Sequence, residues 1–419
     1  MRDALRRLHP FTTPEAERLA LLFGIVYFAQ GMWYLPNQTI TIGLKDAGLS
    51  AGLVANFFAV STVPWLIKPV YGMVSDFLPL FGRRRVSYLV LTSGLAAVAG
   101  ATVGLTGTRE YWTLLALFTA MGVGLAFTDV LADALMVENG RRLNVTGAFQ
   151  SVQWASIYTS AVLVGIVGGW LAHHRHLAGA FLLAACFPLL TLAAGIVVVR
   201  EPRARADRAA LLERVRAVRN ALRAREVWLV AGFIFFFMFS PSFGPGFLYY
   251  QTDRLGFSQQ FIGTLGALQS LGSVLGAVTY APISRRWPLR RRINVVIGLS
   301  AVSVLVYLLY RGAGSAVVID FVYGWVYMVT TLAFLELAAK VCPPHIEGTF
   351  FALLMSIYNA GLQGSQWAGG HLYDAIGFER LVLISAVTTA LVWLLVPLVP
   401  IDAIEARSRA EAAAAVPGG

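Results

Sequence analysis

One lysine and two aspartates carry charge deep inside otherwise apolar stretches of the chain. Lys68 precedes Asp76 by eight residues, so in a helix it lies about 12 Å further from the loop that follows. An ammonium group at that depth costs about 2.5–3.5 kcal/mol and needs a partner or a water-filled cavity. We predict that its partner is Asp133, which has Asp129 one helical turn away on the same face.

The same two aspartates have the chemistry for proton transfer. Two neighbouring carboxylates withdrawn from water favour the binding of a proton by one of them. We therefore predict Asp129 and Asp133 as proton-coupling residues, with a structural network around Lys68 or a contact with a substrate as the alternatives. Glu336 is a third candidate, although its spacing of four residues from Lys340 also predicts a local salt bridge.

Amides and aromatic rings gather near the middle of several predicted membrane spans. Ring faces stack on a flat heterocycle while amides bond to its edge, so this combination favours such a ligand. For each residue, packing or a hydrogen bond between helices is the alternative. The predicted substrate-binding residues are Gln30, Trp33, Tyr34, Gln153, Tyr158, Tyr327, Tyr358, Asn359 and Gln363.

Two places have the residues of a conformational gate. A carboxylate at Asp76 can bond to the arginines that follow it and close the cytoplasmic side, with a solvated loop charge as the alternative. Proline and glycine within 240-SPSFGPGF-247 predict a broken helix, which is either a hinge or a static kink. The predicted gating residues are Lys68, Asp76, Arg83, Arg84, Arg85, Gly244 and Pro245. Asp253 and Asp320 are expected at the outer interface, in reach of water.

The elements that must position these side chains are membrane-spanning helices. Of the 419 residues, 57% are hydrophobic and 13% charged, and the apolar runs approach the roughly 20 residues that cross a bilayer. The chain is expected to be all-α, with twelve spans near 18–44, 51–76, 86–107, 111–138, 145–172, 177–199, 227–253, 258–283, 292–311, 315–340, 346–373 and 379–400.

The loops between these spans predict the orientation. One side carries 26 of the 33 basic residues, which places both termini in the cytoplasm. The long connection 200–226 predicts an amphipathic helix on the membrane surface. The expected organisation is a cytoplasmic segment 1–17, a six-helix bundle 18–199, the linker helix 200–226, a second six-helix bundle 227–400 and a cytoplasmic tail 401–419.

Several classes of function are disfavoured. The net charge of +11 is explained by arginine facing anionic lipid, so we expect no nucleic-acid partner. There is no glycine-rich phosphate loop ahead of a lysine, and 173-HHRH-176 has little support for a metal site. Cys186 and Cys342 have no metal-ligand spacing. We expect a monomer in the lipid bilayer, without metal, cofactor or enzymatic activity, whose partners are a small-molecule substrate and protons.

The two halves of the chain repeat each other. The segments 147-GAF-149 and 168-GGWLAHH-174 match 348-GTF-350 and 369-GGHLYDA-375 at one constant offset of 201, and 83-RRR-85 matches 290-RRR-292. Parallel repeats of six spans joined by a long cytoplasmic loop are typical of the major facilitator fold, in which the substrate site lies near the bilayer midplane.

A longer motif is more specific. The run P-W-x-x-K-P-x-Y-G-x-x-S-D-x-x-P-x-F-G-x-R-R, from Pro64 to Arg85, resembles the signature of the folate-biopterin transporter family within the major facilitator superfamily. The segments 27-YFAQG-31 and 129-DVLADALMVE-138 are similar to that family too. The resemblance implies a proton-driven or exchange carrier for folates, pterins or related organic anions.

The sequence thus predicts a secondary active transporter of the inner (plasma) membrane that moves a small organic solute by alternating access. A folate, pterin or related heterocyclic anion is the expected cargo, and protons the expected coupling ion. The alternatives are an exporter of drugs or sugars, or a membrane factor that delivers pigment or assists assembly without transport. Buried charges and a polar midplane favour transport, since a scaffold needs neither.

Overall fold

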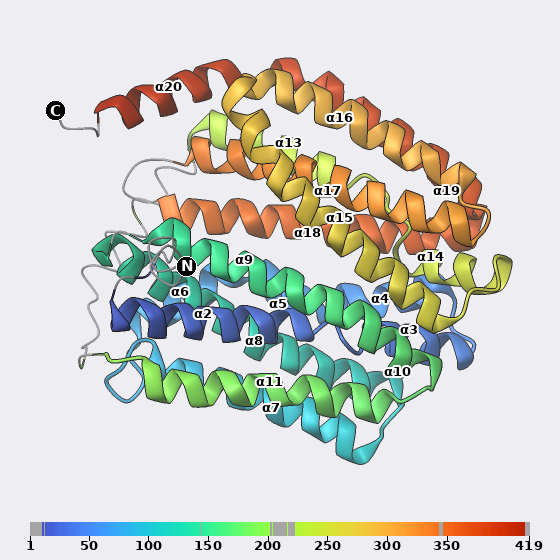
Figure 1. The fold of residues 1–419 in the computed structure, drawn as a ribbon, viewed down its shortest axis with the longest axis horizontal. Helices are drawn as coiled ribbons and strands as arrows, with labels where there is room; N and C mark the ends of the chain where they lie inside the picture. The colour runs from blue at the N-terminus through green and yellow to red at the C-terminus, as the bar shows by residue number, and fades with distance from the viewer. Residues whose placement is uncertain are drawn as a thin grey trace, which may run out of the picture. The chain divides into compact units, whose positions relative to one another are not determined.

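The computed structural model describes residues 11, 13–143, 145–201, 203, 216, 223–342 and 347–414, and these are almost entirely helical (Figure 1). The chain divides into two compact units. Unit 1 contains residues 1–47, 60–211 and 259–267, and unit 2 contains residues 48–59, 212–258 and 268–419. The predicted linker helix 200–226 lies mostly outside the described residues.

The helices of unit 1 form a bundle in which α7 packs against both α8 and α11, and α2 packs against α9 (Figure 1). Phe149 is buried between the rings of Phe11 and Phe23 at one end of this bundle. The helices are α2 (Pro14–Met32), α3 (Asn37–Asp46), α5 (Val63–Leu66), α6 (Lys68–Phe77), α7 (Val86–Thr106), α8 (Tyr111–Leu143), α9 (Thr146–Leu163), α10 (Gly169–His173) and α11 (Leu177–Val198), with a π-helical turn η1 (Val164–Gly168).

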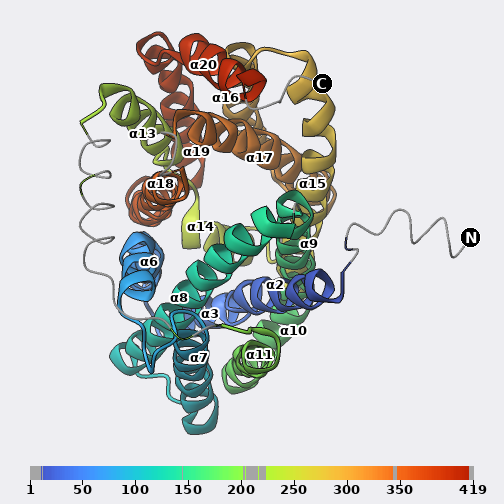
Figure 2. The same cartoon turned by 90° about the vertical axis from the view of Figure 1, so that its left-hand side faces the viewer.

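Unit 2 packs α16 against α17 and α19, and α13 against α18 (Figure 2). The rings of Phe237 and Phe334 stack in its core at 4.2 Å between centroids. The helices are α4 (Ala51–Ser61), α13 (Arg225–Met238), α14 (Gly244–Tyr249), α16 (Leu289–Leu305), α17 (Ala313–Val341), α18 (Glu347–Ile376), α19 (Phe378–Leu391) and α20 (Ile401–Ala414), with short turns η2 (Tyr250–Arg254), η3 (Val306–Leu309) and η4 (Val392–Leu398). Helix α15 (Gln259–Arg286) begins in unit 1 and continues in unit 2.

Local sequence explains where the first of these helices begins. The hydroxyl of Thr13 accepts a hydrogen bond from the backbone N–H of Ala16 at 3.2 Å, and Pro14 is the first helical residue. Glu15 and Glu17 lie in the first turn, where a negative charge favours the positive end of the helix dipole. The capping threonine, the proline and the two acidic residues of the first turn therefore all predict that α2 begins at Pro14.

Nine of the helical segments in the described part of the chain are long and apolar enough to cross a membrane. They coincide with nine of the twelve expected spans. Of the other three, 51–76 consists of the short helices α4, α5 and α6, and 227–253 consists of α13, α14 and η2. The third corresponds to α18, a continuous helix of 30 residues that is not among those nine. The fold is that of a multi-pass helical protein, and the count of twelve stays a prediction.

The break in the 227–253 segment lies where proline and glycine predict it. Helix α13 ends at Met238 and α14 begins at Gly244, which has a left-handed φ of +48°. Pro241 has no N–H to continue the helix. Ser242 instead donates its backbone N–H to the hydroxyl of Ser365 on α18 at 2.9 Å. The broken helix is thus confirmed, while its role as a hinge stays a prediction.

Two glycines bring α15 and α17 into close backbone contact. A Cβ atom at Gly324 would lie 2.0 Å from the carbonyl oxygen of Gln269, and one at Gly272 would lie 2.0 Å from that of Phe321. Small residues at helix crossings in membranes allow this approach. Ser273 completes the contact, because its hydroxyl donates to the Gly324 carbonyl at 3.0 Å.

Replacing Gly324 by leucine should destabilise the protein, because the new side chain meets backbone that cannot move aside. We expect a loss of about 1–3 kcal/mol or more, measured as a lower midpoint of thermal unfolding in detergent. Gly314→Leu is the matched control, because it lies on the same helix with open space around its Cα. Equal midpoints for the two variants would contradict the close crossing of α15 and α17.

Candidate functional site

Lys68 is the first residue of α6, directly after the chain bends at Ile67. Its ammonium lies 2.5 Å from Asp129 Oδ2 on α8, and the side chain of Asp129 is 3% exposed. The predicted pair with Asp133 is wrong. The bend at Ile67 leaves Lys68 at the deep end of α6, level with the aspartate that lies one turn further into α8.

Asp133 has a different set of partners. Its Oδ1 accepts a hydrogen bond from the hydroxyl of Tyr27 on α2 at 2.5 Å and a longer one from the Gln153 amide on α9 at 3.4 Å. Neither donor is charged. The two aspartates therefore differ in the charge of their partners. Asp129 neutralises Lys68, whereas Asp133 accepts hydrogen bonds from neutral donors on two other helices.

A half-buried carboxyl group bound only by neutral donors, such as that of Asp133, can exist with or without its proton. Each of its hydrogen bonds survives protonation if a hydroxyl turns from donor to acceptor, whereas protonation of Asp129 would leave Lys68 as an unpaired buried cation. Asp129 Oδ1 has no hydrogen-bond partner among the described residues. Of the two predicted proton-coupling aspartates, the geometry favours Asp133.

Arg85 is the centre of a second cluster, at the start of α7. Its guanidinium donates to Ser75 Oγ at 2.8 Å and to Glu138 Oε1 on α8 at 2.7 Å. The carboxylate of Glu201 caps the same helix by accepting the backbone N–H groups of Arg84, Arg85 and Val86 at 2.7, 2.9 and 3.2 Å. Of the three predicted gating arginines, Arg85 is buried and the other two are exposed.

Asp76 was expected to close the cytoplasmic side with these arginines. Its backbone lies in α6, but its side chain lies outside the described residues, so the latch stays a prediction. The residues that do hold Arg85, Ser75 and Glu138, were present in the quoted motifs without being assigned a role. A buried serine one residue before an aspartate gives no signal of its own in a single sequence.

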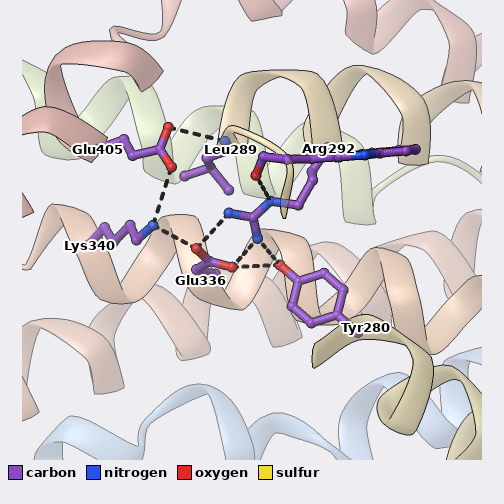
Figure 3. Close-up of polar contacts among 7 residues, drawn as sticks. Tyr280, Leu289, Arg292, Glu336, Lys340 and Glu405 are labelled. Atoms are coloured by element: carbon purple, nitrogen blue, oxygen red, sulfur yellow. Dashed lines mark hydrogen bonds and ion pairs between the residues drawn. The ribbon is translucent and has the colours of Figure 1, made fainter. Parts of the chain in front are cut away.

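Unit 2 contains a corresponding cluster around Arg292, whose side chain is 2% exposed (Figure 3). Its guanidinium makes two bonds to the carboxylate of Glu336 on α17 and one to the hydroxyl of Tyr280 at 2.7 Å. Lys340 donates to the same carboxylate at 2.6 Å. The predicted Glu336–Lys340 salt bridge is confirmed, and Glu336 proves to have a second cation.

The two clusters are built in the same way. Arg85 and Arg292 each end a triplet of arginines, and each bonds to a glutamate on a later helix. Glu405 on α20 accepts the backbone N–H of Leu289 at 3.1 Å, at the start of α16. It lies 116 residues after Leu289, and Glu201 lies 116 residues after Arg85. From the two matching arginines the spacings differ, with Glu201 116 residues after Arg85 and Glu405 113 residues after Arg292, so no fixed spacing in the sequence identifies the capping glutamates.

The predicted substrate-binding residues divide between packing and polar contacts. Trp33 is buried, with its ring stacked on Phe118 at 4.7 Å between centroids. Tyr34, its neighbour, is 45% exposed. In unit 2 the hydroxyls of Tyr327 and Tyr358 lie 3.4 Å apart. Gln153 is buried and donates to Asp133. The other four residues are half-buried, namely Gln30, Tyr158, Asn359 and Gln363, and the role of all nine as ligands stays a prediction.

The model of the BT1 family matches residues 30–415 of the chain. The chain belongs to the BT1 family. This BT1 protein is 33% identical over 402 residues to the folate-biopterin transporter of Synechocystis sp. (strain ATCC 27184 / PCC 6803 / Kazusa), covering 90% of this chain and 79% of that one. It is 28% identical over 342 residues to the probable folate-biopterin transporter 2 of Arabidopsis thaliana, covering 77% and 68%.

Solved structures agree on the fold of the BT1 protein. The crystal structure of a D-xylose-proton symporter superposes with a TM-score of 0.68 at 14% identity, covering 90% of this chain and 96% of that one. The major facilitator fold predicted from the sequence is thereby confirmed. The protein is a membrane transporter for a small molecule rather than an enzyme, and the predicted family is confirmed.

Removing the ammonium at Lys68 should destabilise this BT1 protein strongly, because Asp129 would remain as a buried, unpaired charge. We expect Lys68→Met to cost about 3–5 kcal/mol, measured by unfolding in detergent. The double variant Lys68→Met/Asp129→Leu should recover most of the loss, because it removes both charges.

The control for this pair is the exposed one between Arg175 and Asp46, whose side chains are 44% and 49% exposed. Arg175→Met should change stability by less than about 1 kcal/mol. A Lys68→Met protein as stable as the Arg175→Met protein would contradict a buried ion pair at Lys68.

Proposed function

We propose that this transporter carries a folate, a pterin or a related heterocyclic anion. The observation that carries the proposal is the 33% identity to a folate-biopterin transporter over 90% of the chain. The amides and aromatic rings predicted as ligands suit such cargo, because rings stack on a pterin and amides bond to its edge. The three glutamines, the asparagine and three of the four tyrosines of that set are half-buried or buried in bundles that are otherwise apolar.

The proposed mode of transport is alternating access driven by protons, with Asp133 as the proton-coupling residue. Its support is the difference between the two aspartates of α8. Asp129 has a cation within 2.5 Å, so its charge is satisfied in the structure described. Asp133 has a tyrosine and an amide, so a proton can bind there without leaving a cation unpaired.

The proposal also covers the membrane in which the transporter lies, its orientation and its oligomeric state. We place the transporter in the inner (plasma) membrane as a monomer with both termini in the cytoplasm and no nucleic-acid partner. The support is the basic excess of one set of loops. Arg85 and Arg292 belong to those loops, and each is held by a carboxylate at the end of a helix. Glu336, held by two cations, is proposed as a structural anchor rather than a coupling residue.

The cargo can be tested on the purified protein by thermal unfolding with folates, pterins, nucleosides, sugars and drugs. A ligand at a hundred times its dissociation constant stabilises the folded state by about 2.7 kcal/mol. We expect stabilisation by folates or pterins and none by sugars. Stabilisation by sugars or drugs alone would overturn the proposed cargo and leave the transporter assignment intact.

Replacing Asp133 by asparagine should abolish uptake driven by a pH gradient in proteoliposomes, because the side chain can no longer bind and release a proton. Exchange of labelled for unlabelled substrate across the membrane should continue, since it needs no net proton movement. Asp46→Asn, at the exposed pair with Arg175, is the control and should keep both activities. Gradient-driven uptake at the wild-type rate in Asp133→Asn would exclude this aspartate as the coupling site.

A further inference from the structure

Asp320 on α17 is a buried carboxylate that has no role in the transport mechanism proposed above. The residue is 3% exposed, which contradicts the expected position at the outer interface in reach of water. The physical reason is its neighbours: Tyr307 donates its hydroxyl to Oδ1 at 2.9 Å, and Tyr310 donates to Oδ2 at 2.8 Å. Two phenols thus cover the carboxylate and take the place of water.

The part of the chain that the structure describes has no cation paired with this carboxylate. Among the described residues no lysine, arginine or histidine forms an ion pair with Asp320. The titratable groups that face it are tyrosines, namely Tyr307 and Tyr310 from the η3 segment and Tyr323 from α17 itself. The groups that contact these tyrosines in turn are neutral: Gln251 donates to the hydroxyl of Tyr310, and the ring of Phe247 packs against the rings of Tyr307 and Tyr310.

The charged groups nearest to this cluster lie one step further out. Tyr250 donates to the backbone carbonyl of Tyr310 at 3.1 Å, and Arg254, Arg311 and Glu379 act electrostatically on Tyr250. Tyr310 also accepts a hydrogen bond from the amide of Gln251 at 2.7 Å. Asp320 is therefore enclosed by neutral donors, and an ionised carboxylate in such a place needs either a proton or a cation from outside.

A cavity begins beside this cluster. It measures about 110 Å³ and lies wholly within unit 2, and eleven of the seventeen residues that line it bear a hydroxyl group. Phe243 and Tyr323 line it, and both rings contact the ring of Tyr307, at 4.9 and 5.3 Å between centroids. The hydroxyl-bearing residues of the wall are Ser240, Ser242, Ser300, Ser303, Tyr323, Tyr327, Thr330, Thr331, Ser365, Ser385 and Thr389.

The cavity has the size and polarity to hold water. One water molecule needs about 10–15 Å³ of such cavity volume, so the cavity has room for several. The hydroxyls of Ser242 and Thr331 are buried and have no hydrogen-bond partner among the described residues, while Thr331 as a whole is 7% exposed. Unpartnered hydroxyls in a polar cavity are where buried water binds.

We propose that Asp320 is a proton-binding site of unit 2, supplied by water in the hydroxyl-lined cavity beside Tyr307. The proton reaches Asp320 through Tyr307: a water of the cavity gives a proton to the hydroxyl oxygen of Tyr307 while that hydroxyl passes its own hydrogen to Oδ1 of Asp320. The hydroxyl of Tyr307 then turns from donor to acceptor of that hydrogen bond and directs the hydrogen it received to the cavity. Tyr310 stays in place, because its hydroxyl already accepts from Gln251 and donates to Oδ2.

This site is separate from Asp133 and does not depend on the cargo. Lys68, Asp129 and Asp133 belong to unit 1, whereas Asp320, its tyrosines and the cavity belong to unit 2. A carrier with two such sites binds a proton in each unit. The site at Asp320 can therefore exist even if gradient-driven uptake proves independent of Asp133.

Infrared difference spectroscopy of the full-length protein in lipid tests the proposal, because a protonated carboxylic acid has a carbonyl-stretch band that a carboxylate lacks. We expect such a band to appear as the pH is lowered and to be missing in Asp320→Asn. Asp253→Asn is the matched control, because Asp253 lies near the same end of the unit but is exposed. Spectra of Asp320→Asn identical to those of the wild type at every pH would overturn the proposal.

Tyr307→Phe keeps the test decisive if Asp320→Asn does not fold. It removes one hydrogen-bond partner of the acid, so the band should persist and move to higher frequency. An unmoved band in Tyr307→Phe would show that the acid lies elsewhere. Titrations in sodium and in choline chloride separate the proton from a metal ion: the same band in both supports a proton site, and loss of the band in sodium alone would overturn it.

Discussion

The structure depends on one electrostatic constraint: a charge removed from water must meet a partner inside the protein. In hydrocarbon no solvent replaces a missing hydrogen bond, and the cost of an unpaired ion exceeds that of most packing errors. Lys68, Arg85 and Arg292 meet this constraint with carboxylates from other helices. Each pair joins segments that are distant in the sequence, so the charges also determine which helices pack together.

The two arginine clusters show how one arrangement can serve two bundles. The buried arginine directly precedes α7 in unit 1 and is the fourth residue of α16 in unit 2. In both clusters a glutamate from a later helix binds its guanidinium, and a second glutamate caps the same helix from beyond the last span of its unit. In unit 2 the second glutamate belongs to α20, which is further tied by Arg290 to Asp402 and by Arg407 to Glu226. The expected tail 401–419 is, over its described part, a helix docked on the bundle.

The sequence predicts features that depend on composition and on short spacings along one helix. It does not predict contacts between side chains from different helices. Apolar runs of sufficient length locate nine spans, and the i, i+4 spacing of Glu336 and Lys340 predicts a real salt bridge. The predicted partner of Lys68 was wrong, because depth was counted along one continuous helix, whereas the chain is interrupted at Ile67 and Lys68 pairs with Asp129. Asp320 was placed near water for a similar reason, since its distance from the helix end gives no sign of the two tyrosines that cover it.

The pair between Lys68 and Asp129 has a consequence for how the protein is made. Asp129 follows Lys68 by 61 residues, and at about 5–20 residues per second a ribosome needs roughly 3–12 s to reach it. During that interval the second span contains a cation whose counter-charge has not yet been synthesised. The span is also divided among three short helices, so it has little hydrophobic length with which to hold itself in the bilayer. Until α8 is made, Lys68 has to reach water or lipid headgroups in place of Asp129, or the bilayer bears a cost of about 2.5–3.5 kcal/mol for an unpaired ammonium.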